Sequence, residues 1–518
     1  MEPPTAIVEA GETRTFRTSF SDREEPTDLR IRYEIDGDGT IERVDTTDGW
    51  QCTFAGNAAE CTKDRSFNFT NLLTVTVRAG SDNGSAATFR MIATAGPVSA
   101  PVARSVASAT LQFFAAAVVD TVADSGPGSL RAAIEQANSS TRPVKIVFRI
   151  PAPVPSEGWF TLIPVSPLPA MTGAHVFVDG HSQTRFTGDT NARGPEIAID
   201  GRLAHRGLEI HSRCLARVKG LALGNFDANQ GLWFTKNGPC ETINYYTDYR
   251  EVADNYIGTD PTGTVAWPNR RGLRGDFGSG MIRNNVISGN TYSGLWIWVS
   301  SDRYSSYTIE GNKIGTAADG IAPLPNGAAG MLLGDRVSAD VRQNVIANHP
   351  GMGIALVRGD TYVQIRENSM RNNGGIGIDW GIDGTSPLRD DRQTTDPNAP
   401  TLLSAHYDAG TDRTYFTGRS TAQRPPSPNV VFIIFDFYAN RDAGGGGEEW
   451  LSGVHINFTD AQAFEAWVPG DLRGKWLNAT VTRVPGLLAR PPRVSSEQLL
   501  MTYGDESTSE FSNAVLVP

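Results

Sequence analysis

The chain has 518 residues, which is too many for one compact hydrophobic core, so about two to four domains are expected. Its formal net charge of −11 argues against nucleic acid as a partner, because phosphate binding requires a basic face. The sequence has no long uninterrupted apolar run, so no membrane span is expected, and 54 glycines with 31 prolines are typical of an all-β chain. The first four residues do not resemble a secretory signal peptide, which is expected of either a trimmed chain or a cytoplasmic protein.

Residues 1 to about 112 are predicted to form a β-sheet domain. Apolar and polar residues alternate at 31–35 and at 73–77, as in half-buried strands. Cys52 and Cys61 lie nine residues apart around a Gly-Asn turn sequence, and this spacing suits a hairpin closed by a disulfide.

A short amphipathic helix is predicted next, over residues 129–138. Ser129 can cap its first turn, and Leu130, Ile134 and Ala137 fall on one face. Such a helix could cover the open end of a repetitive β-structure.

The central part of the chain contains internal repeats. The segment from Asn255 to Asn269 recurs 57 residues later, from Asn312 to Asn326, and Asn285, Asn344 and Asn368 each begin the pattern Asn-x-(Ile/Met)-x-x-(Asn/His). A glycine followed by a short, mostly apolar strand recurs at Gly231, Gly272, Gly294, Gly330, Gly353 and Gly375. The short spacings, 22 and 23 residues, define one coil, and the long ones, 41 and 36, contain the duplicated segment as an inserted loop. Strands at this period with no helix between them stack as a parallel solenoid.

The residues after each glycine predict which side of the strand faces the interior. The first and third positions are almost uniformly large and apolar, and alternate side chains of a strand share one face. The first position reads Leu232, Leu273, Leu295, Met331, Ile354 and Ile376, and the third reads Phe234, Gly275, Ile297, Leu333, Leu356 and Ile378. The second and fourth positions vary and are expected to point outward.

Cys214 and Cys240 lie 26 residues apart, close to one coil, so they could stack in neighbouring coils and form a second disulfide. Four free thiols are the alternative. Residues 400–518 again read as strands, for example at 430–437, and a second β-sandwich is the simplest account of them.

Residues 118–138, the duplicated Ile-Gly-Thr loops, residues 372–379 and the ending at 508–514 resemble the bacterial extracellular right-handed parallel β-helix repeat family. The resemblance covers about residues 115 to 518, and it implies a secreted or cell-surface bacterial protein, often joined to immunoglobulin-like modules. The predicted fold is therefore all-β, with an Ig-like β-sandwich at 1–112, a right-handed parallel β-helix with an N-terminal capping helix at 113–399, and a C-terminal Ig-like β-sandwich at 400–518.

The outward positions of three consecutive coils predict a carbohydrate-binding surface. Trp233, Arg274 and Trp296 occupy the second position, and Asp276 and Trp298 the fourth. Neighbouring strands stack at about 4.8 Å, so these side chains would form one patch. Aromatic rings can stack on sugars, and a guanidinium can pair with a carboxylate. Nearby loops add Tyr245, Tyr246, Tyr249, Trp267, Arg270, Arg271, Tyr304 and Tyr307 as candidates. Burial of the tryptophans under another segment, or a protein partner, is the alternative.

An acidic cluster follows the last coil. It consists of Asp379, Asp383, Asp390, Asp391 and Asp396, of which Asp379 is expected to face outward. Asp379 and Asp383 are the candidates for a calcium ion, with a solvated turn as the alternative. No other cofactor is expected.

No catalytic residue is assigned. The paired aspartates and the Gly-His-Gly histidine of β-helix pectinases that resemble polygalacturonases do not occur in the solenoid strands, and the seven histidines lack metal-ligand spacing. A lyase would need a base and a cation, for which Arg274 with Tyr245, Tyr246 or Tyr249 could serve.

Three functions remain open. The favoured one is a secreted or cell-surface protein that binds a polysaccharide or cell-surface glycan through the aromatic and arginine patch. The second is a polysaccharide lyase or hydrolase that acts on an acidic glycan. The third is a non-catalytic adhesive or structural component of an extracellular assembly, with self-association through the sandwich domains.

Overall fold

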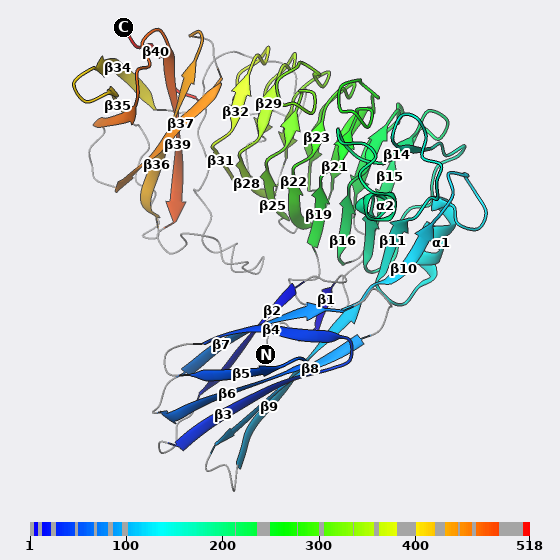
Figure 1. Cartoon of the computed structure of the whole chain (residues 1–518). Coiled ribbons are helices and arrows are strands. Elements are labelled where there is room, and N and C mark those ends of the chain that lie inside the picture. The colour runs from blue at the N-terminus through cyan, green and yellow to red at the C-terminus, as the bar shows by residue number, and fades with distance from the viewer. Residues whose placement is uncertain are drawn as a thin grey trace.

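A computed structural model describes residues 5–8, 13–21, 27–46, 50–66, 70–80, 86–95, 102–212, 214–235, 249–276, 278–299, 305–334, 336–356, 362–380, 400–419, 430–443, 446–457, 463–485 and 511–518. In this part of the chain, sheets dominate, and three units follow one another (Figure 1). The helices are α1 (Leu130–Ser139) and α2 (His181–Thr187). No helix of the described residues is long and apolar enough to cross a membrane.

The N-terminal unit consists of two sheets that share one hydrophobic core. Phe16 and Val75 from the smaller sheet pack with Tyr33 and Phe89 from the larger one. The larger sheet has the order β1 (Thr5–Val8), β9 (Val102–Phe113), β8 (Ala86–Ala95), β3 (Thr27–Asp36), β6 (Ala58–Ser66), β5 (Gln51–Ala55), and the smaller has the order β2 (Thr13–Ser21), β7 (Thr70–Ala79), β4 (Gly39–Thr46). Strand β1 runs parallel to β9, whereas the other pairs are antiparallel.

The predicted disulfide of the N-terminal unit is confirmed. Cys52 and Cys61 lie opposite each other in the hairpin of β5 and β6, and their sulfur atoms are bonded. Cys214 is also disulfide-bonded, whereas Cys240 lies outside the described residues, so the pairing of these two stays a prediction.

The central unit is a parallel β-helix whose described coils run through three sheets (Figure 1). The nine-stranded sheet contains β10 (Ala115–Val119), β11 (Val144–Phe148), β13 (Val176–Asp179), β16 (Ala216–Lys219), β19 (Tyr249–Ala253), β22 (Ser279–Arg283), β25 (Ser305–Glu310), β28 (Val337–Arg342) and β31 (Tyr362–Arg366). The eight-stranded sheet contains β12 (Phe160–Leu162), β14 (Ile197–Asp200), β17 (Ala222–Gly224), β20 (Tyr256–Ile257), β23 (Val286–Ile287), β26 (Lys313–Ile314), β29 (Val345–Ala347) and β32 (Ser369–Arg371). The seven-stranded sheet contains β15 (Leu208–Ile210), β18 (Gln230–Phe234), β21 (Arg271–Gly275), β24 (Leu295–Ile297), β27 (Met331–Leu333), β30 (Ile354–Leu356) and β33 (Ile378–Trp380).

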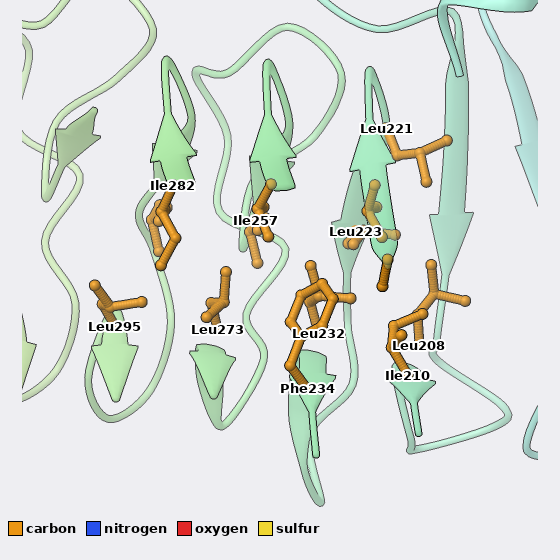
Figure 2. Packing of buried hydrophobic residues seen from close by; sticks show 14 of the residues in the cluster. Leu208, Ile210, Leu221, Leu223, Leu232, Phe234, Ile257, Leu273, Ile282 and Leu295 are labelled. Atoms are coloured by element: carbon orange, nitrogen blue, oxygen red, sulfur yellow. The ribbon is translucent and has the colours of Figure 1, made fainter. Parts of the chain in front are cut away.

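The predicted interior positions lie inside the β-helix. Leu295, Ile297, Leu333, Leu356 and Ile378 are each 0% exposed, whereas Trp296 and Trp298 between them are partly exposed. Figure 2 shows side chains of the seven-stranded sheet, such as Leu232 and Leu273, pointing toward Ile257 and Ile282 of the other two sheets. The alternation of buried and outward residues was therefore predicted in the correct register for these strands.

In the last coil, the predicted strand register is wrong by two residues. Ile378, and not Ile376, pairs with Ile354, so Gly377 takes the place that was assigned to Gly375. The physical reason is Asn373, whose Oδ1 accepts a hydrogen bond from the main-chain N–H of His349 at 3.1 Å and so fixes the position of the turn. The three glycines of this turn left its register open in the sequence.

Two rows of buried polar side chains follow the helix axis. The first row, the asparagine ladder, consists of Asn255, Asn285, Asn312, Asn344 and Asn368; each side-chain NH₂ donates to Oδ1 of the next member at 2.9–3.1 Å. The second row, the mixed ladder, consists of Asn269, Asn290, Asn326, His349 and Asn373. These rows explain the Asn-x-(Ile/Met)-x-x-(Asn/His) pattern. The first residue of the pattern belongs to the asparagine ladder, and the last residue belongs to the mixed ladder.

The burial of His349 leads us to expect that the free energy of unfolding depends on pH. Its Nδ1 accepts from the main-chain N–H of Asn326 at 3.3 Å, and burial lowers its pKa from 6.5 to about 4. Between these two pH values the unfolded chain binds a proton that the folded chain does not, so the free energy of unfolding should rise with pH by about 3 kcal/mol and level off above 6.5. Burial, and then Arg250, lower the pKa of His175 to about 4 as well, so His175 adds a rise of the same sign.

The variant His349→Asn separates the two histidines, since it places asparagine at every position of the mixed ladder. Denaturant titrations from pH 4 to pH 7 should show a shallower rise for His349→Asn than for the parent, while the contribution of His175 remains in both. Equal slopes would show that His349 does not carry the dependence.

Both ends of the β-helix are covered. At the start, Ser129 caps α1 by accepting from the N–H of Ala132 at 3.2 Å, and the buried face of α1 joins the helix core, as predicted. At the other end, Arg366 of β31 pairs with the fully buried Asp436 at 2.9 Å, and Met370 N–H donates to Gly447 O at 2.7 Å. These contacts dock the C-terminal unit on the last coils (Figure 1).

The C-terminal unit also has two sheets with a common core. Phe416 of one sheet packs against Phe437 of the other, with ring centroids 4.1 Å apart. The sheets have the orders β34 (Thr401–Asp408), β35 (Arg413–Arg419), β38 (Ala463–Pro469) and β37 (Glu449–Asn457), β36 (Val430–Asn440), β39 (Trp476–Pro485), β40 (Val515–Leu516).

Candidate functional site

The candidate site lies on the outer face of the seven-stranded sheet. Its central row, here called the outer ladder, takes one residue from each successive coil. The row reads Glu209, Trp233, Arg274, Trp296, Leu332, Ala355 and Asp379. The second outward row contains His211, Asp276, Trp298 and Gly334. Sequence reasoning thus placed Trp233, Arg274, Trp296, Asp276 and Trp298 on one face, and the strand register brings them together there.

Asp276 organises the polar half of this face. Its Oδ2 accepts from the indole N–H of Trp233 at 2.7 Å, and its Oδ1 accepts from Nε of Arg274 at 2.6 Å. The Arg274 guanidinium lies over the Trp233 ring, 5.0 Å from its centroid. Because one carboxylate holds both partners, Trp233 and Arg274 are fixed relative to each other without a ligand.

The aromatic half is built around Trp296. Its ring stacks on Trp298 at 6.2 Å and 25°, and lies 6.0 Å from the ring of Tyr292. Arg271 covers Trp296 with its guanidinium 4.5 Å from the ring centroid. Trp296 and Trp298 also pack on Leu332, Met352 and Ala355 of the following coils. The tryptophans are therefore half-buried members of a packed cluster, and not the free-standing flat platform that the sequence suggested.

Three arginines, Arg270, Arg271 and Arg274, gather on this face. Burial lowers the pKa of Arg271 most, and the charges of Arg270 and Arg274 lower it further. Arg271 is half-buried, and within the described part of the chain its Nε has no hydrogen-bond partner. An anion bound here would relieve the repulsion between these cations, whereas Arg274 already has Asp276.

The structure adds two residues that sequence reasoning missed, Glu209 and His211 on and just after β15. His211 Nε2 lies 3.5 Å from Glu209 Oε2, and the His211 ring meets the Trp233 ring edge-on at 5.6 Å. Arg206 lies 3.7 Å from the other Glu209 oxygen. The signal was present, because the sequence from Gly207 to Ile210 has the same Gly-apolar-polar-apolar pattern 24 residues before Gly231.

Apart from Arg270, the remaining candidates lie away from this face or outside the described residues. Trp267 belongs to an inserted loop and packs over Gly224 of the eight-stranded sheet, and Tyr249 packs beside Phe114 and Phe177 at the nine-stranded sheet. Tyr307 is 5% exposed and belongs to the helix core. Arg270 is exposed next to Arg271. Tyr245, Tyr246, Tyr304, Asp383, Asp390, Asp391 and Asp396 lie outside the described residues.

A metal site cannot be built from the described residues alone, in which no three His, Cys, Asp or Glu side chains gather closely enough. Asp379 is 9% exposed and belongs to the outer ladder. It takes the second position after the glycine of its coil, and not the fourth position that follows from the predicted register. Since Asp383 is not described, calcium binding by this pair stays a prediction.

Residues 271–387 match the family model described as "Right handed beta helix region". Together with the parallel sheets, this match defines the class of fold as a right-handed parallel β-helix. No curated protein matches the chain. Among solved structures, the chain is similar to DesR, a β-glucosidase from Streptomyces venezuelae in complex with D-glucose. The identity is 8%, the TM-score is 0.13, and the match covers 97% of this chain but only 46% of the enzyme. At that TM-score the likeness carries no argument about fold or function.

Proposed function

We propose that this protein is secreted or displayed on a bacterial cell surface and binds a polysaccharide along the outer ladder. The observation that carries the proposal is that Trp233, Arg274 and Trp296 occupy the same outward position in three consecutive coils. A linear polymer laid along the helix axis would meet a new coil about every 4.8 Å, so neighbouring sugars could contact neighbouring coils. Indole rings offer apolar faces to sugar C–H groups, and arginines offer donors to hydroxyl and acidic groups.

Two other features support an extracellular setting. The Cys52–Cys61 disulfide favours an oxidising compartment. The N-terminal unit, with β1 parallel to β9 and a core shared by two sheets, supports the proposal of an immunoglobulin-like module. Such modules would link the β-helix to a surface or to neighbouring copies.

The variant Trp296→Ala tests the proposed binding. Loss of the central ring of the aromatic half should weaken polysaccharide binding by about 1–3 kcal/mol, the range known for aromatic stacking platforms. Isothermal titration calorimetry against a panel of neutral and acidic polysaccharides measures the effect. The matched control is Trp467→Ala, which removes a 44% exposed tryptophan from β38 of the C-terminal unit and should leave binding unchanged.

A Trp296→Ala protein that melts several degrees lower yet binds every polysaccharide like its parent would contradict the proposal. That result would favour the adhesive or structural function, in which Trp296 only packs the outer ladder. Melting curves of both variants must therefore accompany the titrations.

Cleavage of an acidic polysaccharide is the second candidate function, and the pair Glu209–His211 favours it. The pair lies one coil before Trp233 and two coils before the arginines, so a histidine base oriented by a carboxylate could act on a uronate bound along these coils. Incubation with uronate polymers should then produce unsaturated ends that absorb ultraviolet light. The variant His211→Gln should abolish this signal while binding remains.

A further inference from the structure

Another row of side chains, separate from the outer ladder and from the mixed ladder, consists of the residue just before the glycine of each coil. Gln230 pairs with Arg271 in the strand register, and Ser293 takes the same place in the next coil, where its carbonyl accepts from Gly272 N–H at 3.1 Å. All three carry polar atoms that have no hydrogen-bond partner among the described residues. These atoms are Oε1 and Nε2 of Gln230, Nε of Arg271 and Oγ of Ser293.

Two of these three side chains are almost completely buried. Gln230 is 2% exposed and Ser293 is 1% exposed. Buried polar groups in native proteins nearly always have partners, so unsatisfied groups in three successive coils require an explanation. Unsatisfied groups at one isolated position could be a packing defect, whereas a row of them in successive coils is consistent with contacts to water or to a ligand.

The strands cannot shift to satisfy these groups from within. The next residue in each coil is a glycine that packs directly on the mixed ladder: a Cβ on Gly231 would lie 2.6 Å from Nδ2 of Asn269. That amide group already donates to Leu223 O and to Oδ1 of Asn290. The backbone is therefore fixed by contact with the ladder, and the ladder has no spare donor for Gln230.

The polar part of the row coincides with the arginine cluster. In the following coils the same row continues as Ala329 and Met352, and Met352 packs against Trp296 and Trp298. Within the described part of this row, the polar atoms without a partner therefore lie in the coil that carries Arg270, Arg271 and Arg274 and in the coils directly before and after it. Amide, guanidinium and hydroxyl groups all donate hydrogen bonds, and together with unbalanced positive charge they suit an oxyanion.

We propose that Gln230, Arg271 and Ser293 form an anion subsite of the polysaccharide-binding surface, and that the protein selects polymers with carboxylate or sulfate groups. Arg271, the partly exposed member, contacts the anion, and Gln230 and Ser293 flank it in the preceding and following coils. This inference rests on the proposed polysaccharide binding and names its ligand class.

The experiment uses the full chain and polymers that differ only in charge. Each neutral polysaccharide of the panel is paired with its carboxymethylated and its sulfated derivative, and the dissociation constants are compared at fixed salt. We expect the charged derivatives to bind about tenfold more tightly than the neutral parent, the size of effect typical of a charge-assisted hydrogen bond. Whichever derivative gains more identifies the anion as a planar carboxylate or a tetrahedral sulfate.

Variants then locate the preference. Arg271→Gln should bring the ratio of the dissociation constants for neutral and charged polymers to about one, whatever it does to the binding of neutral polymers. Gln230→Leu should reduce this ratio, and Arg271→Lys should restore part of it. The control is Arg342→Gln, which removes a positive side chain, 44% exposed, from the nine-stranded sheet and should leave the preference unchanged.

The outcomes distinguish the two proposals. If neutral and charged polymers bind equally well, or if Arg271→Gln retains the preference, the anion subsite is overturned while polysaccharide binding stands. If no polymer of any charge binds, both fail. Because Arg271→Lys keeps the charge and the packing stem, a loss of preference in Arg271→Gln with recovery in Arg271→Lys cannot be attributed to misfolding.

Discussion

The variant Asn312→Ala is expected to lower the free energy of unfolding by about 3–5 kcal/mol, because one truncation leaves several buried groups without partners. Asn312 Oδ1 accepts from the main-chain N–H of Asn285 at 3.0 Å and from its side-chain amide at 2.9 Å. Its own amide donates to Ile282 O at 2.8 Å, Glu310 O at 3.1 Å and Oδ1 of Asn344 at 2.9 Å. The bond to Glu310 O is partly buried and the other four are buried, where water cannot readily replace them.

Urea denaturation followed by tryptophan fluorescence measures this loss, since Trp296 and Trp298 lie in the same β-helix. Asn229→Ala is the control, because Asn229 is a partly exposed asparagine outside both ladders and should cost less than about 0.5 kcal/mol. A cost for Asn312→Ala equal to that of Asn229→Ala would mean that the asparagine ladder contributes little net stability.

The variant Leu333→Ala should cost about 2–5 kcal/mol, since it leaves a cavity in a fully buried stack. Leu333 pairs with Ile297 in the preceding coil and Leu356 in the following one, and all three are 0% exposed. Rigid neighbours on both sides limit the collapse that could fill the cavity. The control Leu403→Ala removes the same atoms from a 53% exposed position and should change the unfolding midpoint little. If both variants unfolded at the same urea concentration, close packing of the interior would be disproved.

The sequence predicts the interior of the β-helix well because a coil repeats one physical environment. Leu295, Met331 and Ile354 meet the same neighbours one coil apart, so each repeat constrains the others. The prediction slipped at the last coil, where neighbouring glycines offered two alignments. The hydrogen bond from His349 N–H to Asn373, which decides between them, is a contact between coils and could not be predicted from either coil alone.

The candidate site was predicted less completely, for a geometric reason. Each coil passes through three sheets, so residues close in sequence point to different sides of the molecule. Trp267 and Tyr249 were grouped with Trp233 by proximity in the chain, but they lie at the eight-stranded and nine-stranded sheets. His211 was not grouped with Trp233, although the two rings are in contact. Which arginine covers which tryptophan depends on side chains from neighbouring coils, and no sequence pattern encodes that choice.

The docking of the C-terminal unit has a consequence for how the molecule can associate. A parallel sheet that ends in open solvent offers a template on which another chain can add a strand, and a solenoid with a bare end could grow into a fibre. Here the N–H of Met370 on β32 is already bonded to Gly447, and the hydroxyl of Ser369 donates to Glu448 O. Elongation from this coil would have to displace the C-terminal unit and break the buried pair of Arg366 and Asp436. The C-terminal unit therefore occupies the positions at which another chain would add a strand to β32.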